Sequence, residues 1–348
     1  MSGFFIMSSE RSGSNLVRKM LAMHSDIAAP PPPHLWRHLS RVLPYYGSLA
    51  KEDNFREMVA DAIALTQVRG SHLQWKYVPV PEKLLPNIRF RNLSGLLSVL
   101  YSWYASQEGV SNWVCKENNI FDHAFQIREV LPDARFIYLC RDGRDCACSI
   151  KKVPSHDQHI YNIAQEWRRE QEECLRVYQE LKALDAVCLL RYEDLLEHPE
   201  AELKRVCAFL GVAYQSEMLQ FYTADEARSE AQKTDYWKNL SRPLMQNNKA
   251  KFLQQLPMKE IGLFEQVAGN VLRVLGYPLV TDTAVQPIKR IQHLRYNLQN
   301  KIQVYNRRRQ LATDPGWQAR QKLLKQIRRR KVDKAPSYKP LLDYKTKS

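Results

Sequence analysis

Hydrophobic positions along the chain alternate between two spacings. Short apolar runs, of the length expected for buried strands, occupy 4–7, 112–116, 134–140 and 186–192. Between them, apolar residues recur at helical spacing, and this predicts helices over 16–23, 55–66, 93–106, 122–131, 144–152, 160–184, 200–210 and 259–275. Strands that alternate with helices predict an α/β fold with a central parallel sheet flanked by helices. The prolines within 28–36 exclude regular structure there.

The pattern changes after residue 286. Six apolar residues recur at steps of three or four, namely Ile288, Ile291, Leu294, Leu298, Ile302 and Tyr305. This spacing predicts a helix with one apolar stripe and a basic remainder. The sequence "DPG" at 314–316 ends it, a second basic helix is predicted over 318–331, and we expect the last residues to be disordered. We therefore divide the chain into a domain over 1–286 and a basic helical extension over 287–348.

Charge follows the same division. The chain carries 52 Lys and Arg against 37 Asp and Glu, a net charge of +15. Residues 287–348 hold 18 of the basic and 3 of the acidic residues, so the rest of the chain is neutral. Four roles for this tail stay open: a solvated appendage whose apolar stripe packs on the body, peripheral contact with an anionic membrane, contact with an anionic acceptor, or homodimerisation. Nucleic-acid binding is not expected, because no recognition motif is present.

Three features bear on the compartment. No apolar run reaches the roughly 18 residues of a membrane-spanning helix, and the N-terminus lacks the features of a signal peptide. The seven cysteines show no zinc-like pairing, and several lie in apolar stretches typical of buried free thiols. We expect a reducing, cytoplasmic location, with attachment to the inner membrane face as an option.

A glycine-containing loop follows the first predicted strand. In "SSERSGSN" (8–15), Gly13 allows close backbone approach, Ser12, Ser14 and Asn15 offer polar side chains, and Arg11 supplies a fixed positive charge. A loop between strand and helix presents free N–H groups to an anion. The Walker spacing with its lysine is absent, which disfavours magnesium-dependent nucleotide hydrolysis. A tight turn with a capping Ser or Asn is the alternative.

A second stretch of this kind is "ARFIYLCRDGRDCACSI" (134–150). Arg141 ends the predicted strand, and Ser149 lies about two turns into the following helix. The two side chains can close on one phosphate from two sides. The alternative is an Arg–Asp surface cluster with a buried helical serine.

Together these stretches resemble the nucleotide-dependent sulfotransferases. The first is similar to that family's 5′-phosphosulfate loop, and the second to its 3′-phosphate segment. The resemblance covers about residues 1–280. It implies a P-loop-like three-layer fold, a 3′-phosphoadenosine 5′-phosphosulfate donor, and no metal.

Three further segments fit the resemblance. "LLRYEDLLEHPEAELKRVCAFLGV" (189–212) is similar to the family's segment whose tyrosine lies beside the adenine, which is Tyr192 here. "WVCKENN" (113–119) resembles the strand that ends in a substrate-side lysine, Lys116. "NKAKFLQQLP" (248–257) resembles the late loop whose lysine closes over the nucleotide, and Lys251 matches it. A core tyrosine and a solvated lysine are the alternatives for Tyr192 and Lys251.

The chain also departs from the family pattern. Glu10 stands where proline is usual and places a carboxylate near two phosphates, so we expect it to turn outward or to pair with Arg11. Gly143 replaces a proline and should loosen its turn. Leu16 stands where cytosolic members carry an adenine-stacking tryptophan. Arg11 in place of lysine is more like the protein-tyrosine and bacterial branches.

Transfer of a sulfuryl group needs a base for the acceptor proton. The candidate is His34, at the end of the polyproline stretch, because proline fixes the backbone and imidazole titrates near neutral pH. A surface histidine is the alternative reading of His34. His24 and Glu117 are rival bases, and His123 is expected on a helix surface. Arg11 and Lys116 would neutralise the charge on the leaving oxygen.

The sequence therefore predicts a sulfotransferase that acts on a hydroxyl of a saccharide, a lipid-linked glycan or another small metabolite. Two other classes stay open: a P-loop-type nucleotide kinase or hydrolase, and a catalytically inactive relative that serves as a basic scaffold.

Overall fold

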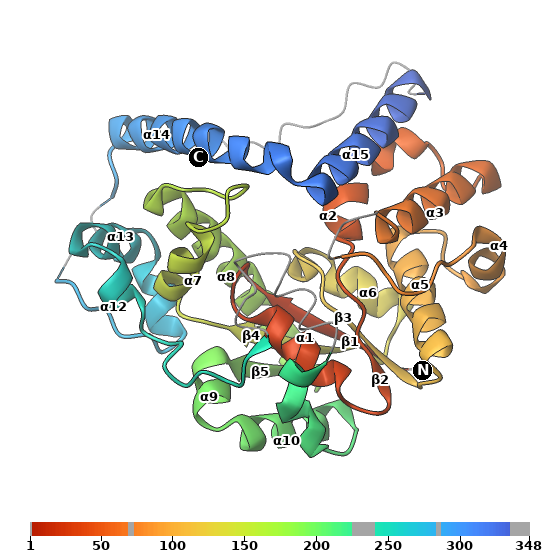
Figure 1. Ribbon diagram of the computed structural model, residues 1–348, viewed down its shortest axis with the longest axis horizontal. Coiled ribbons are helices and arrows are strands. Elements are labelled where there is room, and N and C mark those ends of the chain that lie inside the picture. Colours follow the sequence, from red (N-terminus) through yellow and green to blue (C-terminus); the bar gives the residue numbers. More distant parts are fainter. Residues whose placement is uncertain (1, 69–72, 225–240, 283–286, 335–348) are drawn as a thin grey trace.

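Five parallel strands form one sheet within the residues that the structure describes, which are 2–68, 73–224, 241–282 and 287–334 of this computed structural model (Figure 1). The strand order is β2-β3-β1-β4-β5. Their bounds are β1 (Ser2–Ser8), β2 (Ile27–Ala28), β3 (Asn112–Cys115), β4 (Arg135–Cys140) and β5 (Val187–Arg191). Because all four neighbouring pairs are parallel, the carboxyl ends of the strands meet at one edge of the sheet. Ligands of open α/β sheets bind at that edge.

Helices cover both faces of the sheet, which makes three layers (Figure 1). Alternate residues of β1 belong to different apolar clusters: Phe4 and Ile6 face one layer, and Phe5 and Met7 face the other. The first layer is formed by α1 (Ser14–Ala22), α9 (Tyr192–Glu197), α10 (Pro199–Leu210) and the 3₁₀ helix η4 (Ser216–Thr223). The second contains α5 (Leu93–Glu108), α6 (Ala124–Val130), α8 (Ile160–Lys182) and α13 (Met258–Val274). The predicted fold class is thereby confirmed.

The long predicted elements agree with the structure to within a few residues, and two short regions do not. The prolines at 30–33 lie outside any helix or strand as predicted, but the ends of the 28–36 stretch are regular: β2 ends at Ala28 and α2 (Leu35–Leu39) begins at Leu35. The helix predicted over 122–131 is split into a 3₁₀ turn, Ile120–His123, and α6. Both errors concern elements too short for hydrophobic periodicity to resolve.

Several further helices lie around the edge of the sheet. They are α3 (Glu52–Thr66), α4 (Pro81–Leu84), α7 (Gly143–Ile150), α12 (Phe252–Gln255) and the 3₁₀ helices η1 (Leu43–Tyr46) and η2 (Leu85–Asn87). All seven cysteines are buried and unpaired, as expected for free thiols of the core. No helix in the described ranges is long and apolar enough to cross a membrane.

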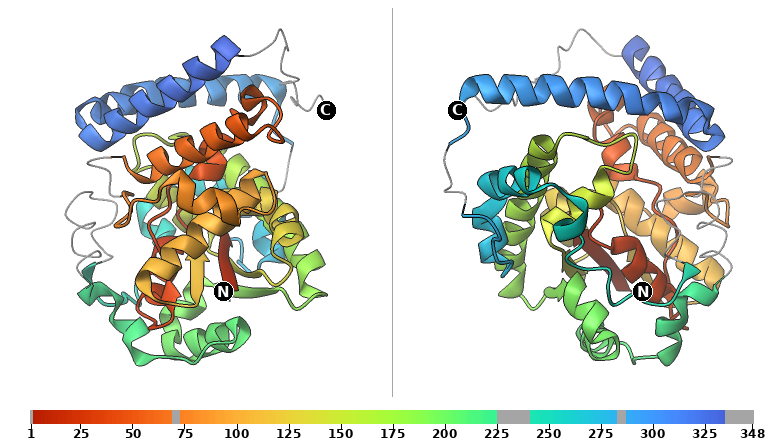
Figure 2. Two further views of the ribbon diagram at one scale, coloured as in Figure 1. Left: turned by 90° about the vertical axis from the view of Figure 1, so that its right-hand side faces the viewer. Right: turned by 60° about the vertical axis from the view of Figure 1, so that its left-hand side comes forward.

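The C-terminal extension lies along the body in both views of Figure 2. It consists of α14 (Arg290–Arg308), the 3₁₀ turn η6 (Arg309–Thr313) and α15 (Pro315–Lys334). The "DPG" sequence separates the two helices as predicted, but α15 begins at Pro315 itself. Asp314 accepts a hydrogen bond from the backbone N–H of Trp317 at 2.8 Å and so caps the helix. The proposed division near residue 286 and the expected disorder of the last residues fall on or beside 283–286 and 335–348, outside the described part.

The apolar stripe of α14 faces away from the body. The exposed fractions of Ile291, Leu294, Leu298, Ile302 and Tyr305 lie between 53% and 74%. The helix is instead anchored by a polar side chain: Asn300 Oδ1 accepts hydrogen bonds from the backbone N–H groups of Gln158 and His159 at 2.8 and 3.0 Å. The option in which the stripe packs on the body is therefore contradicted for these five residues, whereas Ile288 does pack against the core. Hydrogen bonds to Asn300 and the packing of Tyr296 decide which face of α14 turns inward.

Candidate active site

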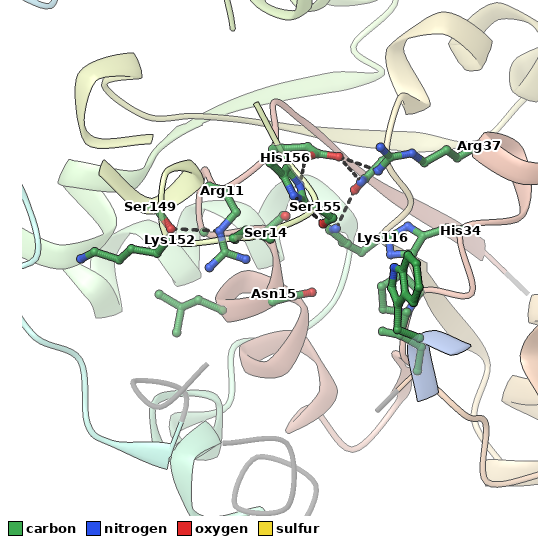
Figure 3. A pocket seen from close by; sticks show the side chains of 18 of the residues that line it. Arg11, Ser14, Asn15, His34, Arg37, Lys116, Ser149, Lys152, Ser155 and His156 are labelled. Atoms are coloured by element: carbon green, nitrogen blue, oxygen red, sulfur yellow. Dashed lines mark hydrogen bonds and ion pairs between the residues drawn. The ribbon is translucent and has the colours of Figure 1, made fainter. Parts of the chain in front are cut away.

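A cavity of about 1020 Å³ opens at the carboxyl edge of the sheet. Its walls come from the segments after β1, β3 and β4, from α2, and from η6 and α15. Ten of the predicted site residues line it: Arg11, Gly13, Ser14, Asn15, His34, Lys116, Arg141, Ser149, Tyr192 and Lys251. In Figure 3, Arg11, Ser149 and Lys152 stand on one side, and His34 and Arg37 on the other. The sheet thus brings together residues that are far apart in the sequence.

The loop after β1 has the backbone of an anion-binding loop. Arg11 and Gly13 adopt positive φ angles of 65° and 98°, and no side chain caps the start of α1. The first N–H groups of a helix have no partner within it, so Ser14 and Asn15 present theirs to the cavity. A Cβ atom at Gly13 would come within 2.5 Å of the Tyr192 ring. Only glycine lets the loop pass beneath that ring.

Ser12 differs from its neighbours. Its side chain is fully buried, and its Oγ lies 2.7 Å from the Oγ of Ser9. It does not line the cavity, so its hydroxyl is not placed to meet a ligand there. A contribution from Ser12 to ligand binding has to come from its backbone N–H.

The loop after β4 meets the first loop directly. Arg11 Nε donates to Ser149 Oγ at 2.9 Å (Figure 3). Arg141 Nη1 donates to the carbonyl of Arg11 at 3.4 Å, and its Nη2 to that of Asn248 at 3.0 Å. The guanidinium also lies 4.2 Å from the centre of the Tyr192 ring. The buried Nε of Arg141 has no partner among the described residues.

The turn that contains Gly143 is tied by hydrogen bonds and closely packed, so the structure gives no sign of the looser turn that we expected. Asp142 caps α7 and accepts hydrogen bonds from the backbone N–H, Nε and Nη2 of Arg144 at 2.9, 3.0 and 2.7 Å. A Cβ at Gly143 would come within 2.5 Å of Trp167 and 2.6 Å of Phe264. Glycine is present here because the two aromatic rings leave no room for a side chain.

Glu10 is the centre of a hydrogen-bond network, so the expectation that it turns outward is wrong. Its Oε1 accepts from Arg37 Nη1 at 2.8 Å and from Asn118 Nδ2 at 2.7 Å, and its Oε2 contacts His156. Burial alone would raise the pKa of this carboxyl, but His156, Arg37 and Lys116 together lower it below its usual range. Glu10 is therefore ionised and holds α2 to the loop after β1.

Lys116 follows β3 and lies between the two sides of the cavity. Its Nζ donates to Asn118 Oδ1 at 2.9 Å. Burial lowers the pKa of the ammonium to about 8, although the charges of Glu10 and Glu117 oppose the shift. The side chain is thus a buried cation at neutral pH and becomes neutral slightly above it.

His34 occupies a strained position at the start of α2. Its φ is 59°, in the left-handed region that non-glycine residues rarely adopt. Its Nδ1 is buried and has no partner in the described part of the chain. Burial, followed by the charges of Lys116 and Arg320, lowers the pKa of the imidazole well below 6.5. The ring is therefore neutral at neutral pH and free to accept a proton.

The rival bases are placed less well. His24 lies outside the cavity, and both of its ring nitrogens are used: Nε2 lies 2.7 Å from the carbonyl of Ala213, and Nδ1 accepts from the N–H of Asp26. Glu117 is 2% exposed and does not line the cavity. Burial raises the pKa of Glu117 to about 7, although hydrogen bonds from backbone N–H groups at the start of α2 act to lower it. His123 stacks on Trp36 at 5.5 Å between ring centres.

Comparison with known proteins identifies the family. The sequence profile of the sulfotransferase family matches residues 3–216, more than half of the chain. The chain belongs to this family. Protein-tyrosine sulfotransferase A of Caenorhabditis elegans is 24% identical over 174 residues, which are 44% of this chain and 42% of that protein. The chain thus matches less than half the length of this curated relative.

Among solved structures, one with a TM-score of 0.50 agrees with the fold of a sulfotransferase. The sulfotransferase domain from the curacin biosynthetic pathway is 20% identical, with a TM-score of 0.50 over 80% of this chain and 99% of that one. The sulfotransferase domain from the Synechococcus PCC 7002 olefin synthase is 21% identical, with a TM-score of 0.48 over 76% and 93% of the two chains.

The cavity also contains residues that the sequence analysis missed. Arg37 and His38 on α2, His156 after α7, and Trp317 and Arg320 on α15 all line the cavity. The first two follow His34 within one helical turn, so a helix predicted there would have suggested them. No local sequence pattern predicts that α15 lines the cavity, because only the folding of the chain brings this helix beside it.

Proposed function

We propose that this sulfotransferase transfers a sulfuryl group from 3′-phosphoadenosine 5′-phosphosulfate to a hydroxyl of a saccharide, a lipid-linked glycan or another small metabolite. The observation that carries the proposal is the direct contact between the two phosphate loops, through Arg11 Nε and Ser149 Oγ. A donor that is phosphorylated at both ends needs two anion sites held at a fixed separation.

The residues present suit such a donor. The uncapped start of α1, together with Arg11 and Lys116, would hold the 5′-phosphosulfate. Arg141, Ser149 and Lys251 would hold the 3′-phosphate, and the unpartnered Nε of Arg141 is one donor for it. Charge-assisted hydrogen bonds to the phosphate oxygens would stabilise the bound donor strongly.

An apolar end of the cavity would receive the adenine. Tyr192, Leu16, Phe221 and Leu244 line this part of the wall. The hydroxyl of Tyr192 accepts a hydrogen bond from Asn248 Nδ2 at 2.6 Å, which fixes the ring. Leu16 has no ring to stack on the adenine, and Phe221 is an aromatic candidate for that contact.

The reaction breaks the bond between sulfur and the bridging phosphate oxygen and forms a bond between sulfur and the acceptor oxygen. His34 would take the acceptor proton as this bond forms. Arg11 and Lys116 would neutralise the charge on the leaving phosphate oxygen. The prolines at 30–33 would hold His34 in its position beside the acceptor with little further loss of backbone entropy.

Calorimetry with adenosine 3′,5′-bisphosphate and with ATP, each with and without magnesium, tests the donor. We expect tight bisphosphate binding that does not depend on the metal. Binding of ATP alone would favour the P-loop kinase or hydrolase. Bisphosphate binding without turnover of labelled donor across an acceptor panel would favour an inactive scaffold.

We also propose that α14 docks on an anionic lipid surface, such as the inner face of a cytoplasmic membrane. Its exposed apolar stripe is flanked by basic residues, and the sequence has no acidic residue between Lys289 and Arg309. An amphipathic helix of this kind binds at the lipid–water interface.

Flotation with phosphatidylserine and phosphatidylcholine vesicles tests the lipid contact. We expect binding to the anionic vesicles only, and loss of binding in Leu294→Asp/Leu298→Asp. Val274→Asp, which alters an exposed apolar side chain of α13, is the matched control. A dimer in sedimentation that the double variant dissociates would show instead that the stripe is a subunit interface.

A further inference from the structure

Arg320 on α15 is a buried cation that forms no ion pair with the described residues. It is 8% exposed and lines the cavity. Its Nη1 donates to the carbonyl of Pro33 at 3.0 Å, and its Nη2 has no partner among the described residues. A buried charge that is not paired is costly to the folded protein. Such a group is retained where a ligand supplies the missing charge.

The surroundings of Arg320 are basic. Arg37 and His38 of α2, Arg41 just after it and Arg328 of α15 also line the cavity. Burial first, and then the charges of Arg320 and the three other arginines, lower the pKa of His38 to about 3. Burial lowers the pKa of Arg320 itself to about 10. Groups on this side of the cavity therefore experience a strong positive potential.

The nearby carboxylates do not neutralise this side. Glu10 is engaged by Arg37, Asn118 and His156. Asp314 lines the cavity but caps α15 through the N–H of Trp317. Glu117 attracts Arg320 through space, yet no ion pair joins them within the described ranges. Support of the polyproline stretch explains the contact from Nη1 to Pro33 but does not explain why Nη2 has no partner among the described residues.

The position of Arg320 relates it to the acceptor. Its contact, Pro33, directly precedes His34, and the described phosphate loops lie on the other side of the cavity (Figure 3). The cavity volume of about 1020 Å³ lies at the upper end of the usual range for ligand pockets, about 300–1,000 Å³. It has room for an acceptor beside the nucleotide.

We propose that the acceptor is a small molecule that carries an anionic group, a carboxylate or a phosphate, which the Arg320 guanidinium binds. Arg41 and Arg328, which also line the cavity, add to the attraction. Binding of this group would direct a neighbouring hydroxyl of the acceptor toward His34. The inference rests on the proposed function and names its substrate class, and it gives the C-terminal extension a part in the site.

Matched acceptor pairs test the proposal. The full-length enzyme is assayed with ³⁵S-labelled donor on p-nitrophenyl glucuronide against p-nitrophenyl glucoside, and on glucose 6-phosphate against glucose. We expect kcat/KM for an anionic member to exceed that of its neutral partner by about 10- to 100-fold, the range of a charge-assisted hydrogen bond. The two pairs separate recognition of a carboxylate from recognition of a phosphate. Equal rates within both pairs would overturn the proposal.

Variants assign the preference to Arg320. Arg320→Met keeps the apolar length of the side chain and should abolish the preference, and Arg320→Lys should restore part of it. Lys322→Met, on an exposed position of the same helix, removes one charge and should change nothing. Unaltered melting temperature and bisphosphate affinity confirm that each variant is folded. A preference that survives in Arg320→Met contradicts the assignment.

A binding measurement covers the case in which none of the four acceptors is used. Inorganic phosphate is titrated by calorimetry into protein saturated with adenosine 3′,5′-bisphosphate. We expect one additional phosphate site that Arg320→Met removes and Lys322→Met leaves intact. Absence of that site overturns the proposal, and failure of the bisphosphate to bind overturns the proposed function instead.

Discussion

The proposed donor side and the proposed acceptor side of the cavity are built in different ways. On the donor side, Arg11 and Arg141 lie within three residues of the ends of parallel strands, and the pairing of β1 with β4 brings their loops together. On the acceptor side, His34 and Arg320 are 286 positions apart in the sequence and meet because α15 packs on η1 and α3. The sheet fixes the first side, and the helices that are layered around it form the second.

The two sides also differ in how far their polar groups contact one another. On the donor side, Arg11 Nε donates to Ser149 Oγ and Arg141 donates to the carbonyl of Arg11, although Arg141 Nε has no partner among the described residues. On the acceptor side, His34 Nδ1 and Arg320 Nη2 have no partner in the same part of the chain. Loops that contact each other directly suit the preorganised binding of a nucleotide that is constant.

Replacement of His34 should have the largest effect. We expect His34→Gln to lower kcat by about 10²–10⁴-fold through loss of the base, with adenosine 3′,5′-bisphosphate affinity unchanged. Single-turnover assays with labelled donor measure the first quantity, and calorimetry measures the second. His123→Gln, which alters a histidine outside the cavity, is the control. Retained turnover in His34→Gln would assign the base to another residue.

Replacement of Arg141 should affect the affinity for the bisphosphate rather than kcat. We expect Arg141→Met to weaken bisphosphate binding by about 10- to 100-fold, because a charge-assisted contact to phosphate is lost, while the preference among acceptors persists. Calorimetry tests this, with Lys249→Met as a control that breaks only an exposed pair with Glu197. A change in acceptor preference would show that the two sides are not separate.

The pH profile should reflect both sides. Burial lowers the pKa of His34, so its neutral form persists at pH 6.5 and kcat should fall only in more acidic solution. Burial lowers the pKa of Lys116 to about 8, so loss of its proton should reduce kcat above that pH. Lys116→Arg should remove the alkaline decline, because arginine stays charged. A decline centred at pH 6.5 would contradict the environment assigned to His34.

Replacement of Glu10, which joins the two sides, should have the smallest effect. We expect Glu10→Gln to lower the free energy of unfolding by about 1–2 kcal/mol through loss of charge-assisted hydrogen bonds, with bisphosphate affinity nearly unchanged. Its neighbours lower the pKa of Glu10, so the contribution is present above the unfolded pKa and is lost as the pH falls through the folded value. Urea unfolding at pH 7 measures the loss. Unchanged stability would show that the network adds nothing.

The sequence by itself determined the sheet and the phosphate loops. Apolar runs, a glycine with positive φ and the adjacent arginines are local features, and parallel strands place whatever follows them at one edge. The burial of cysteines in apolar stretches and the break between helices at "DPG" were predictable for the same reason. The role of His34 as a base stays a prediction, although its position in the cavity suits it.

Only the tertiary structure decided the partners of Glu10, the close packing of the Gly143 turn and the place of the tail. A stripe of apolar residues shows that a helix is amphipathic, but not which face packs. In α14, hydrogen bonds that Asn300 Oδ1 accepts from backbone N–H groups hold the opposite face inward. In α15, the packing of Leu324 and Ile327 carries Arg320 into the cavity. Such contacts join residues distant in the chain, so no local pattern could predict them.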